Sequence, residues 1–360
     1  MPGPQARVAL LSAAVLVSLL VLAFLLPVPF IKLSPGPTYN VIGDVDGKPL
    51  VAITGAQTYP TSGQLDMTTV LELGGPRGGL TFVDALGSWF DQSDAVLPRE
   101  LLYPDDVSGE DVQQRQAVMF STSQSNAVAA AATYLGRPVN ENVVVNAVYA
   151  DSPSSGVFQP GDRVLTVDGQ AVAVPSDVSS AIRAKPAGTT FIVDVDRPST
   201  SDPLAPPSPE RLTVTSAPNP DDPSVPFIGI GVGVLYTSDF DAAFTLHDVG
   251  GPSAGLMFTT GIVDRLTPRD LTKGRHIAGT GTIDPSGAVG PIGGIRQKLA
   301  GARRAGAELF VMPRAHCAEA EGFIPAGLTV VPVDTLGDAI SAIDDWTAGR
   351  PVAACPARKA

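Results

Sequence analysis

The most constraining feature of the sequence is an uncharged, apolar stretch near its start. Residues 8–31 contain no charged side chain, and residues 10–26 are Leu, Val, Ala and Phe apart from Ser12 and Ser18. A helix needs about 20 apolar residues to cross the hydrocarbon core of a bilayer, whereas a helix packed on a soluble core keeps a polar face. We therefore expect a transmembrane anchor over residues 8–31.

The residues on either side of this stretch predict whether it is cleaved and how it is oriented in the membrane. Arg7 precedes it, Lys32 follows it, and no Ala-x-Ala cleavage site comes after it. This favours a retained anchor, with a cleaved signal peptide as the alternative. A basic residue on the amino-terminal side predicts that this end stays inside. The domains that follow are then expected at the cell membrane on its extracytoplasmic side.

The charge and the cysteine count exclude several classes of protein. The chain has 24 Lys+Arg against 36 Asp+Glu, a net charge of −12, so it lacks the basic face that nucleic acids require. Cys317 and Cys355 are its only cysteines and it has 3 histidines, which cannot supply a four-thiolate zinc site. We expect no metal and no cofactor. The two cysteines could pair in an oxidising compartment or stay apart.

The rest of the chain is expected to form an α+β fold in several segments. Strands are predicted early in residues 34–124, a β-rich segment spans residues 125–217, and the segment 225–348 leads to a tail at 349–360. The segment 225–348 is short of strands in its first part. We therefore expect the early strands to join its sheet, with the β-rich segment as an insertion.

The β-rich segment carries two tight-turn motifs around one apolar strand. Gly161-Asp and Asp-Gly169 flank Val164-Leu-Thr-Val167, a pattern typical of glycine turns. This order resembles a PDZ domain of the kind found in bacterial proteases; two ordinary hairpin turns are the alternative. The resemblance implies an open sheet edge that accepts an extended peptide. Residues 134–137 are the candidate glycine loop beside that edge.

A serine stands in a glycine-rich turn, Gly250-Gly-Pro-Ser-Ala-Gly255. The glycines permit a tight turn, and Pro252 suits the first turn of a helix. Ser253 is then expected at a helix N-terminus, where free N–H groups can hold a developing oxyanion. Ser253 is a candidate nucleophile supported by Gly251 and Pro252. A polar helix cap is the alternative role for this serine.

A lysine stands on the apolar side of a predicted helix. At about 100° per residue, Lys298 shares a face with Ile295, Ala302 and Ala305, while the arginines of the segment point elsewhere. Burial would disfavour the ammonium form and provide a neutral amine as a general base. The alternative is a lysine that lies along the edge of the helix with its charge in water.

Several motifs follow one another in the second half of the chain. They are Gly251-Pro-Ser-Ala-Gly255, Gly279-Thr-Gly281, Val289-Gly-Pro-Ile-Gly-Gly-Ile-Arg-Gln-Lys-Leu-Ala300, Arg304-Ala-Gly306 and Phe310-Val-Met-Pro313. In this order they resemble the proteolytic domain of Lon-type serine proteases, peptidase family S16. With the apolar start and the PDZ-like segment, the layout resembles bacterial membrane-anchored Lon-like peptidases.

The resemblance implies roles for three residues: Ser253 as the nucleophile, Lys298 as the general base, and Thr280 as the hydrogen-bond partner of the lysine amine. The chain departs from the ATP-dependent members in two places: it has His247-Asp-Val-Gly-Gly251 where they carry Pro-Lys-Asp-Gly before Pro-Ser, and Thr282 where they usually have Glu. No G-x-x-x-x-G-K-[ST] phosphate loop occurs in the sequence.

We therefore expect an ATP-independent serine endopeptidase that cleaves unfolded or flexible protein segments, with a PDZ-like domain for recruitment or regulation. Lon-type domains often form rings, so a homo-oligomeric ring is a further expectation.

Two other functions fit parts of the sequence. Gly251-Pro-Ser-Ala-Gly255 also matches the G-x-S-x-G pattern of esterases, with His276 or His316 downstream as the base. Against an esterase, glycines and a proline interrupt any strand before the serine. The other function is a catalytically inactive, membrane-tethered PDZ adaptor. The serine, lysine and threonine at matching positions weigh against it.

Overall fold

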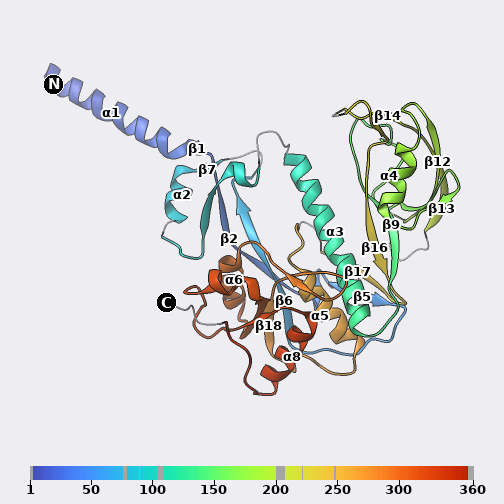
Figure 1. Cartoon of the computed structure of the whole chain (residues 1–360). Helices are drawn as coiled ribbons and strands as arrows, with labels where there is room; N and C mark the ends of the chain where they lie inside the picture. The colour runs from blue at the N-terminus through green and yellow to red at the C-terminus, as the bar shows by residue number, and fades with distance from the viewer. Residues whose placement is uncertain are drawn as a thin grey trace.

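The computed structural model describes residues 3–75, 79–88, 90–103, 109–199, 207–220, 222–246 and 249–355. Figure 1 shows three parts of the chain: a helix that projects at the amino-terminal end, a main body, and a second domain. We call this second domain, residues 140–237, the inserted domain. The main body and the inserted domain both combine strands and helices, so the α+β class is observed.

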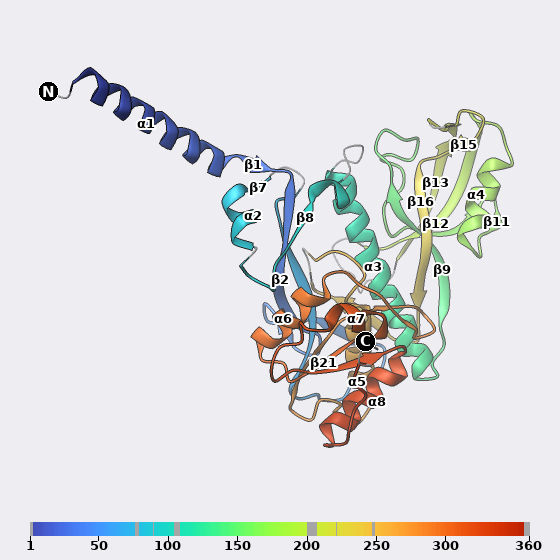
Figure 2. The same ribbon diagram turned by 60° about the vertical axis from the view of Figure 1, so that its left-hand side comes forward.

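The amino-terminal helix α1 (Pro4–Leu25) projects from the main body in both ribbon views (Figures 1 and 2). The Phe24 ring contacts the Phe82 ring of α2 (Phe82–Ser88), with centroids 5.7 Å apart. Apolar side chains along α1 are exposed; Leu11, for example, is 66% exposed. Yet among the described residues no helix has the length and apolar character needed to cross a membrane, so the predicted transmembrane anchor is not supported.

The main body is built on a six-stranded sheet in the order β22-β21-β18-β6-β2-β8. Its strands are β2 (Phe30–Asn40), β6 (Gln64–Leu73), β8 (Ala95–Pro98), β18 (His276–Gly279), β21 (Leu309–Pro313) and β22 (Thr329–Val333). From β6 to β22 the pairs are parallel, while β2 is antiparallel to β6 and to β8. Strands from before and after the inserted domain therefore share one sheet.

The strand β18 covers only part of one edge of β6. β18 pairs only with residues 64–67 of β6. Within the described ranges, the remaining residues of β6 pair on their other side with β2 alone. One edge of β6 is therefore available beside the end of β18.

Three long helices pack against this sheet, namely α5 (Gly255–Leu266), α6 (Ile295–Ala305) and α8 (Leu336–Thr347), and a fourth, α3 (Gly109–Tyr134), packs on α5. Every residue of α5 except Arg265 is buried, as expected for a helix that is apolar all round. Phe258 of α5 packs against Phe120 of α3, with ring centroids 5.8 Å apart. The core of the main body thus lies around α5, between the sheet and α3.

Short elements complete the main body. They are β1 (Pro27–Val28), β3 (Asp44–Val45), β4 (Lys48–Pro49), β5 (Val51–Thr54), β7 (Leu80–Thr81), β17 (Asp241–Phe244), β19 (Thr282–Ile283), β20 (Val289–Gly290), α7 (Cys317–Ala320) and the 3-10 turns at Arg99–Leu101 and Arg314–His316. After the inserted domain the chain returns to the main body with β17, which pairs with β5.

The inserted domain has its own sheet, in the order β13-β12-β10-β9-β16, with β11 paired to β10. Its elements are β9 (Asn140–Val148), β10 (Arg163–Val167), β11 (Gln170–Ala171), α4 (Pro175–Arg183), β12 (Thr190–Arg197), β13 (Ser208–Thr215), β14 (Ala217–Pro218), β15 (Pro226–Phe227) and β16 (Ile230–Thr237). A separate apolar core includes Phe158, Phe191 and Ile182. The structure places β16 here, although the sequence grouped residues 225–237 with the following domain.

The candidate loop at residues 134–137 joins α3 to β9, next to the end of β16. Tyr134 is the last residue of α3, Gly136 has φ +67°, and Arg137 pairs with Asp239 at 2.9 Å. Gly136 permits the left-handed conformation that commonly ends a helix. This stretch is therefore a helix end, and its part in holding a peptide stays a prediction.

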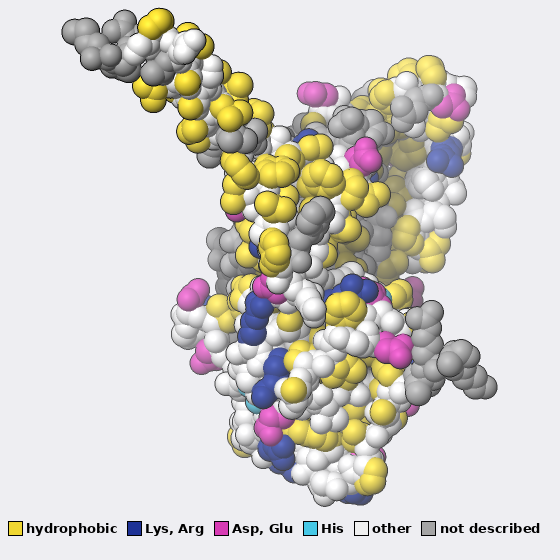
Figure 3. Space-filling model, turned by 90° about the vertical axis from the view of Figure 1, so that its left-hand side faces the viewer, with side chains coloured by type: hydrophobic (Ala, Val, Ile, Leu, Met, Phe, Trp, Pro, Cys, Tyr) yellow, Lys and Arg dark blue, Asp and Glu magenta, His cyan; other side chains and the backbone are white. Residues whose placement is uncertain are grey.

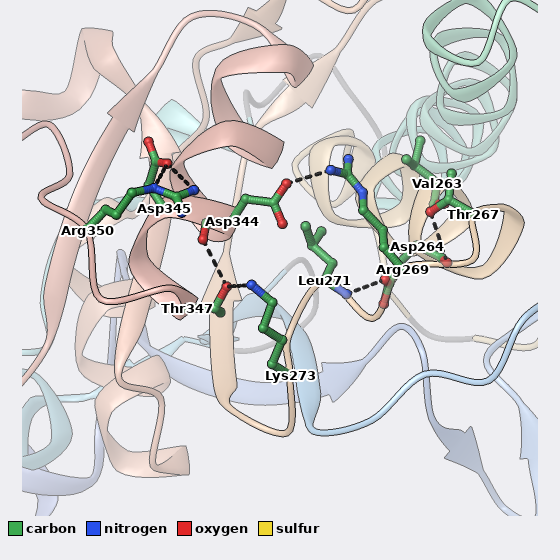
Figure 4. Close-up of polar contacts among 10 residues, drawn as sticks. All are labelled: Val263, Asp264, Thr267, Arg269, Leu271, Lys273, Asp344, Asp345, Thr347 and Arg350. Carbon is green, nitrogen blue, oxygen red and sulfur yellow. Dashed lines mark hydrogen bonds and ion pairs between the residues drawn. The ribbon is translucent and has the colours of Figure 1, made fainter.

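The segment after α5 is fastened to α8 by polar contacts, which Figure 4 shows. Arg269 contacts Asp344 at 2.5 Å, and the Lys273 ammonium donates to the Thr347 hydroxyl at 3.1 Å. The buried Asp264 carboxylate accepts from the Leu271 amide at 2.8 Å. Burial raises the pKa of Asp264 to about 6. These contacts hold the end of α5 opposite to the serine.

A disulfide joins Cys317 to Cys355 and resolves the two alternatives left by the sequence. Both cysteines pack against an apolar cluster that contains Leu299 of α6 and Phe310 of β21. The bond therefore fixes the start of the tail beside the helix that carries Lys298.

Candidate active site

Ser253 lies in the turn directly before α5, and neighbouring backbone groups hold that turn on both sides. Gly251 has φ +82°, a conformation that a side chain would strain. Its N–H donates to the Gln116 carbonyl at 3.1 Å, and the Gly281 N–H donates to the Ser253 carbonyl at 3.0 Å. The Ser123 hydroxyl of α3 donates to the Pro252 carbonyl at 2.9 Å. The position of the serine is thus set by α3 and by the strand end at Gly281.

Lys298 reaches this serine from α6. Gly294 precedes the helix with φ +70°, and a Cβ there would come within 2.7 Å of Val70 of β6, so glycine lets the helix start close to the sheet. Lys298 is only 2% exposed. Its Nζ lies 2.6 Å from the Ser253 Oγ and 2.9 Å from the Thr280 Oγ1. The structure therefore brings the three predicted residues together.

The buried face of α6 is the one that the sequence predicted, except at the end of the helix. Ile295 and Ala302 are buried with Lys298, and Arg296 is exposed. Ala305, predicted on the buried face, is exposed because it is the last residue of the helix and the chain turns away at Gly306. The buried stripe thus ends one turn earlier than predicted.

The Lys298 amine is buried without an anionic partner. In the parts of the chain that the structure covers, no carboxylate forms an ion pair with it, and its neighbours are hydroxyl groups. Burial lowers the pKa of Lys298 to about 7, from an ordinary value of 10.5, because a low-dielectric environment disfavours the ammonium form. Near neutral pH a substantial fraction of this amine therefore carries a lone pair.

Thr280 connects the lysine to the backbone of the serine. The residue is completely buried at the end of β18, and its N–H donates to the Val311 carbonyl of β21 at 3.0 Å. Its hydroxyl accepts from the Lys298 amine and donates to the Ser253 carbonyl at 3.0 Å. With two N–H groups and one lone pair, a neutral amine can donate to Thr280 and accept the Ser253 hydroxyl proton.

A cleft of about 660 Å³ opens over the serine and the lysine. Residues 67–72 of β6 form one wall, and residues 249–254 and 291–294 form the others. Apolar side chains prevail, among them Leu33, Tyr39 and Leu71. The unpaired edge of β6 thus faces the cleft.

The geometry does not support the esterase alternative. The His276 ring contacts the buried Asp66 carboxylate at 2.9 Å, and the His316 ring accepts from the Ile292 N–H at 2.9 Å. Neither histidine contacts Ser253, whose side-chain partner is Lys298. His247 and Asp248 lie outside the described residues.

Two aspects of the site were not predicted. The Gly251 N–H, one of the backbone groups near the serine, donates to the Gln116 carbonyl and is not free to hold an oxyanion. Gln116 and Ser123 of α3, more than 120 residues before the serine turn, were not identified as site residues, and no sequence motif marks them. Among the described residues no cluster of three or more His, Cys, Asp or Glu side chains could hold a metal ion.

Comparison with known proteins finds two families in the chain. Residues 247–343 match the Lon protease (S16) C-terminal proteolytic domain, and residues 119–204 match the PDZ domain. The chain is 39% identical to a Lon protease of Chloroflexus aurantiacus over 94 residues, 25% of this chain and 11% of that protein. It is 43% identical to a Lon protease of Desulfosudis oleivorans over 76 residues, 21% of this chain and 9% of that protein.

Among solved structures, the PDZ domain of the SdrC-like protein from Listeria monocytogenes is similar to 25% of this chain and 86% of its own, at 24% identity and a TM-score of 0.21. The chain spans about a tenth of the length of the Lon proteases that it matches.

Proposed function

We propose that this chain, which carries a Lon-type proteolytic domain and a PDZ domain, is a serine endopeptidase with Ser253 as the nucleophile and Lys298 as the general base. One observation carries the proposal: the Ser253 Oγ lies 2.6 Å from the amine of a buried lysine whose pKa burial lowers to about 7. A serine hydroxyl becomes a nucleophile when a neighbouring base can take its proton.

The chemistry is acyl transfer in two steps. The neutral Lys298 amine takes the Ser253 proton while Oγ attacks a peptide carbonyl, and the resulting ammonium then gives that proton to the leaving amine. The acyl-enzyme is hydrolysed by water, which Lys298 activates in the same way. Thr280 holds the amine in place by accepting one of its hydrogen bonds.

The developing oxyanion needs two or more N–H donors. The Gly251 N–H is already used, but the Ser253 and Ala254 N–H groups form no hydrogen bond within the residues that the structure covers. Both stand just before α5 and benefit from its N-terminal dipole. We therefore assign the oxyanion site to these two amides.

The substrate we propose is an unfolded or flexible protein segment, cleaved without ATP. The cleft lies beside an available edge of β6, which can pair with an extended chain. The 360 residues contain no phosphate loop that could bind a nucleotide. Both features favour substrates that are already unfolded.

We further propose that the chain works at a membrane, outside the cytoplasm. Exposed apolar side chains run along α1 and continue onto α2, where Phe82 is 44% and Val83 51% exposed; Figure 3 shows them gathered on α1 and on the body beneath it. The Cys317–Cys355 disulfide favours an oxidising compartment. Flotation of the full-length chain with lipid vesicles tests the membrane contact: a chain that stays at the bottom of the gradient contradicts it.

The inserted domain, which contains most of the PDZ match and which we call the PDZ domain from here on, offers β16 as the edge for recruitment. The sheet order ends at β16 among the described strands, and α4 lies near it. The Tyr236 N–H points away from β9, since it donates to the Ser125 hydroxyl at 2.7 Å. N–H groups two residues apart share an edge, so Val234 and Val232 also present theirs outward. A peptide strand can pair there.

Cleavage of casein by the purified full chain, without nucleotide, tests the proposed activity. The parent should release peptides, whereas Ser253→Ala and Lys298→Ala should not. Ser121→Ala, an exposed serine on α3, is the control and should retain full activity. An inert parent that still binds casein would instead support a PDZ adaptor.

A further inference from the structure

Helix α3 contacts both the PDZ domain and the serine turn. Both ribbon views show it between the main body and the inserted domain (Figures 1 and 2). Ser123 and Ser125, two residues apart and both buried, each form one long-range hydrogen bond. The Ser123 hydroxyl donates to the Pro252 carbonyl at 2.9 Å, and the Ser125 hydroxyl accepts from the Tyr236 N–H of β16 at 2.7 Å.

The contact at Ser123 acts on the nucleophile through one peptide unit. The Pro252 carbonyl belongs to the peptide bond whose N–H is that of Ser253, one of the two amides assigned to the oxyanion. Gln116, nearly two turns earlier on α3, fixes the same turn through the Gly251 N–H at 3.1 Å. A shift of α3 would therefore move both the nucleophile and the oxyanion donor.

The contact at Ser125 lies on the edge where a peptide would add. Val232, Val234 and Tyr236 present their N–H groups to the same side of β16, and Ser125 takes the last of them. A strand that pairs with Val232 and Val234 must end against Ser125. Occupation of this edge and the position of α3 are thus physically linked.

Other contacts make α3 a support for the site as a whole. The Asn126 amide donates to the Ile283 carbonyl at 3.1 Å, and Thr133 donates to the Pro285 carbonyl at 3.1 Å, both on the segment that leads from Thr280 to α6. Because a packed helix moves as a unit, a change at one of its contacts is carried to the others.

We propose that Ser123 and Ser125 are positioning residues, through which α3 couples the β16 edge of the PDZ domain to Ser253. Ser123 fixes the turn that aims the nucleophile, and Ser125 fixes α3 to β16. This inference rests on the proposed peptidase function and adds to it how the PDZ domain acts on the reaction.

The test compares Ser123→Ala, Ser125→Ala and their double variant in the full chain, with Ser121→Ala on the same helix as the matched control. The substrate is a fluorogenic hexapeptide, too short to reach both domains. Ser123→Ala should lower kcat about fivefold with KM unchanged, because one neutral hydrogen bond is lost. Ser125→Ala should lower kcat about threefold although Ser125 touches no residue of the dyad. Ser121→Ala should match the parent.

The double variant separates coupling from independent damage. If both serines act through α3, the double variant should be no slower than Ser123→Ala alone; if they act independently, the two effects multiply. A full kcat in Ser125→Ala, or multiplied effects in the double variant, would overturn the inference. Thermal unfolding of each variant shows which fraction is folded, and kcat is expressed per folded chain.

A separate readout tells failure of the inference from failure of the proposed function. A fluorophosphonate probe labels an activated serine without needing a peptide substrate. A parent chain that neither cleaves the hexapeptide nor reacts with the probe overturns the proposed function, and the inference with it. A parent that reacts at the same rate as Ser125→Ala overturns the inference alone.

Discussion

Two cations, the buried Lys298 and the partly buried Arg197, lie in different domains and differ in the groups that surround them. In the PDZ domain, Arg197 donates two hydrogen bonds of 2.7 Å to the buried Asp162 carboxylate and one of 2.6 Å to Glu210. In the proteolytic domain, the hydrogen-bond partners of the Lys298 amine among the described residues are the hydroxyls of Ser253 and Thr280. The Asp162 contact raises the pKa of Arg197 further, whereas burial lowers the pKa of Lys298 to about 7.

The difference shows what turns a buried cation into a reactive group. A carboxylate partner compensates the lost hydration of a charge and fixes it for a structural role. Without such a partner the charge itself is disfavoured, and the neutral, basic form appears near physiological pH. The cost of removing a cation from water is thus offset by a carboxylate at Arg197 and leaves a neutral amine at Lys298.

The largest expected effect is the loss of activity in Lys298→Arg. A guanidinium stays charged at all accessible pH values and cannot take the proton of Ser253. We expect kcat to fall at least about 10³-fold. Peptide release from casein measures it, and Arg296→Lys, an exchange at an exposed position of the same helix, should be nearly neutral. Activity within tenfold of the parent would show that another group is the base.

The next prediction concerns the free energy of unfolding and tests the structural role of Arg197. Arg197→Met leaves the buried Asp162 carboxylate without its partner, which should lower the free energy of unfolding by about 3 kcal/mol. Urea unfolding measures it. Arg211, which is 72% exposed and pairs with Asp194, is the control, because exposed ion pairs contribute little. Equal losses in Arg197→Met and Arg211→Met would contradict the structural role of Arg197.

The opposite sign is expected for Lys298→Met. At pH 6 the buried Lys298 ammonium destabilises the folded parent, so replacing this lysine by methionine should raise the free energy of unfolding by about 2 kcal/mol. Above pH 7 the folded parent is neutral while the unfolded lysine stays protonated up to its ordinary pKa of 10.5. The free energy of unfolding of the parent therefore rises with pH between about 7 and 10.5 and approaches that of Lys298→Met. Urea unfolding at several pH values would reveal a constant difference if burial did not act on the charge.

Of the four changes compared in this section, Thr280→Val is expected to have the smallest effect, because it removes only the hydroxyl that orients the amine and keeps the shape of the side chain. We expect kcat to fall about tenfold with little change in KM, since the nucleophile and base both remain. Thr260→Val is the matched control, because Thr260 is also buried and its hydroxyl donates to the Leu256 carbonyl within α5, away from Lys298. A similar loss of kcat in both variants would show a general packing defect.

The sequence predicted the local parts of the site well. The turn at Gly251 and the buried face of α6 depend on residues close in the chain, and the Lon-type motifs identified Thr280 as the partner of Lys298. The contacts of α3 could not be predicted, because Ser123 meets Pro252 only through the packing of α3 on α5. The place of β16 was missed for the same reason: its partner β9 precedes it by about 90 residues, and no local pattern records that pairing.

The most direct test of the dyad measures how fast a fluorophosphonate labels Ser253 as the pH is varied, with full-length chain and no nucleotide. The labelling rate should rise about tenfold per pH unit below pH 7 and level off above it, because only the neutral amine of Lys298 activates the serine. Lys298→Met should remain unlabelled at every pH. A rate that climbs only near pH 10, as with an ordinary lysine, or that persists in Lys298→Met, would contradict a Ser253–Lys298 dyad.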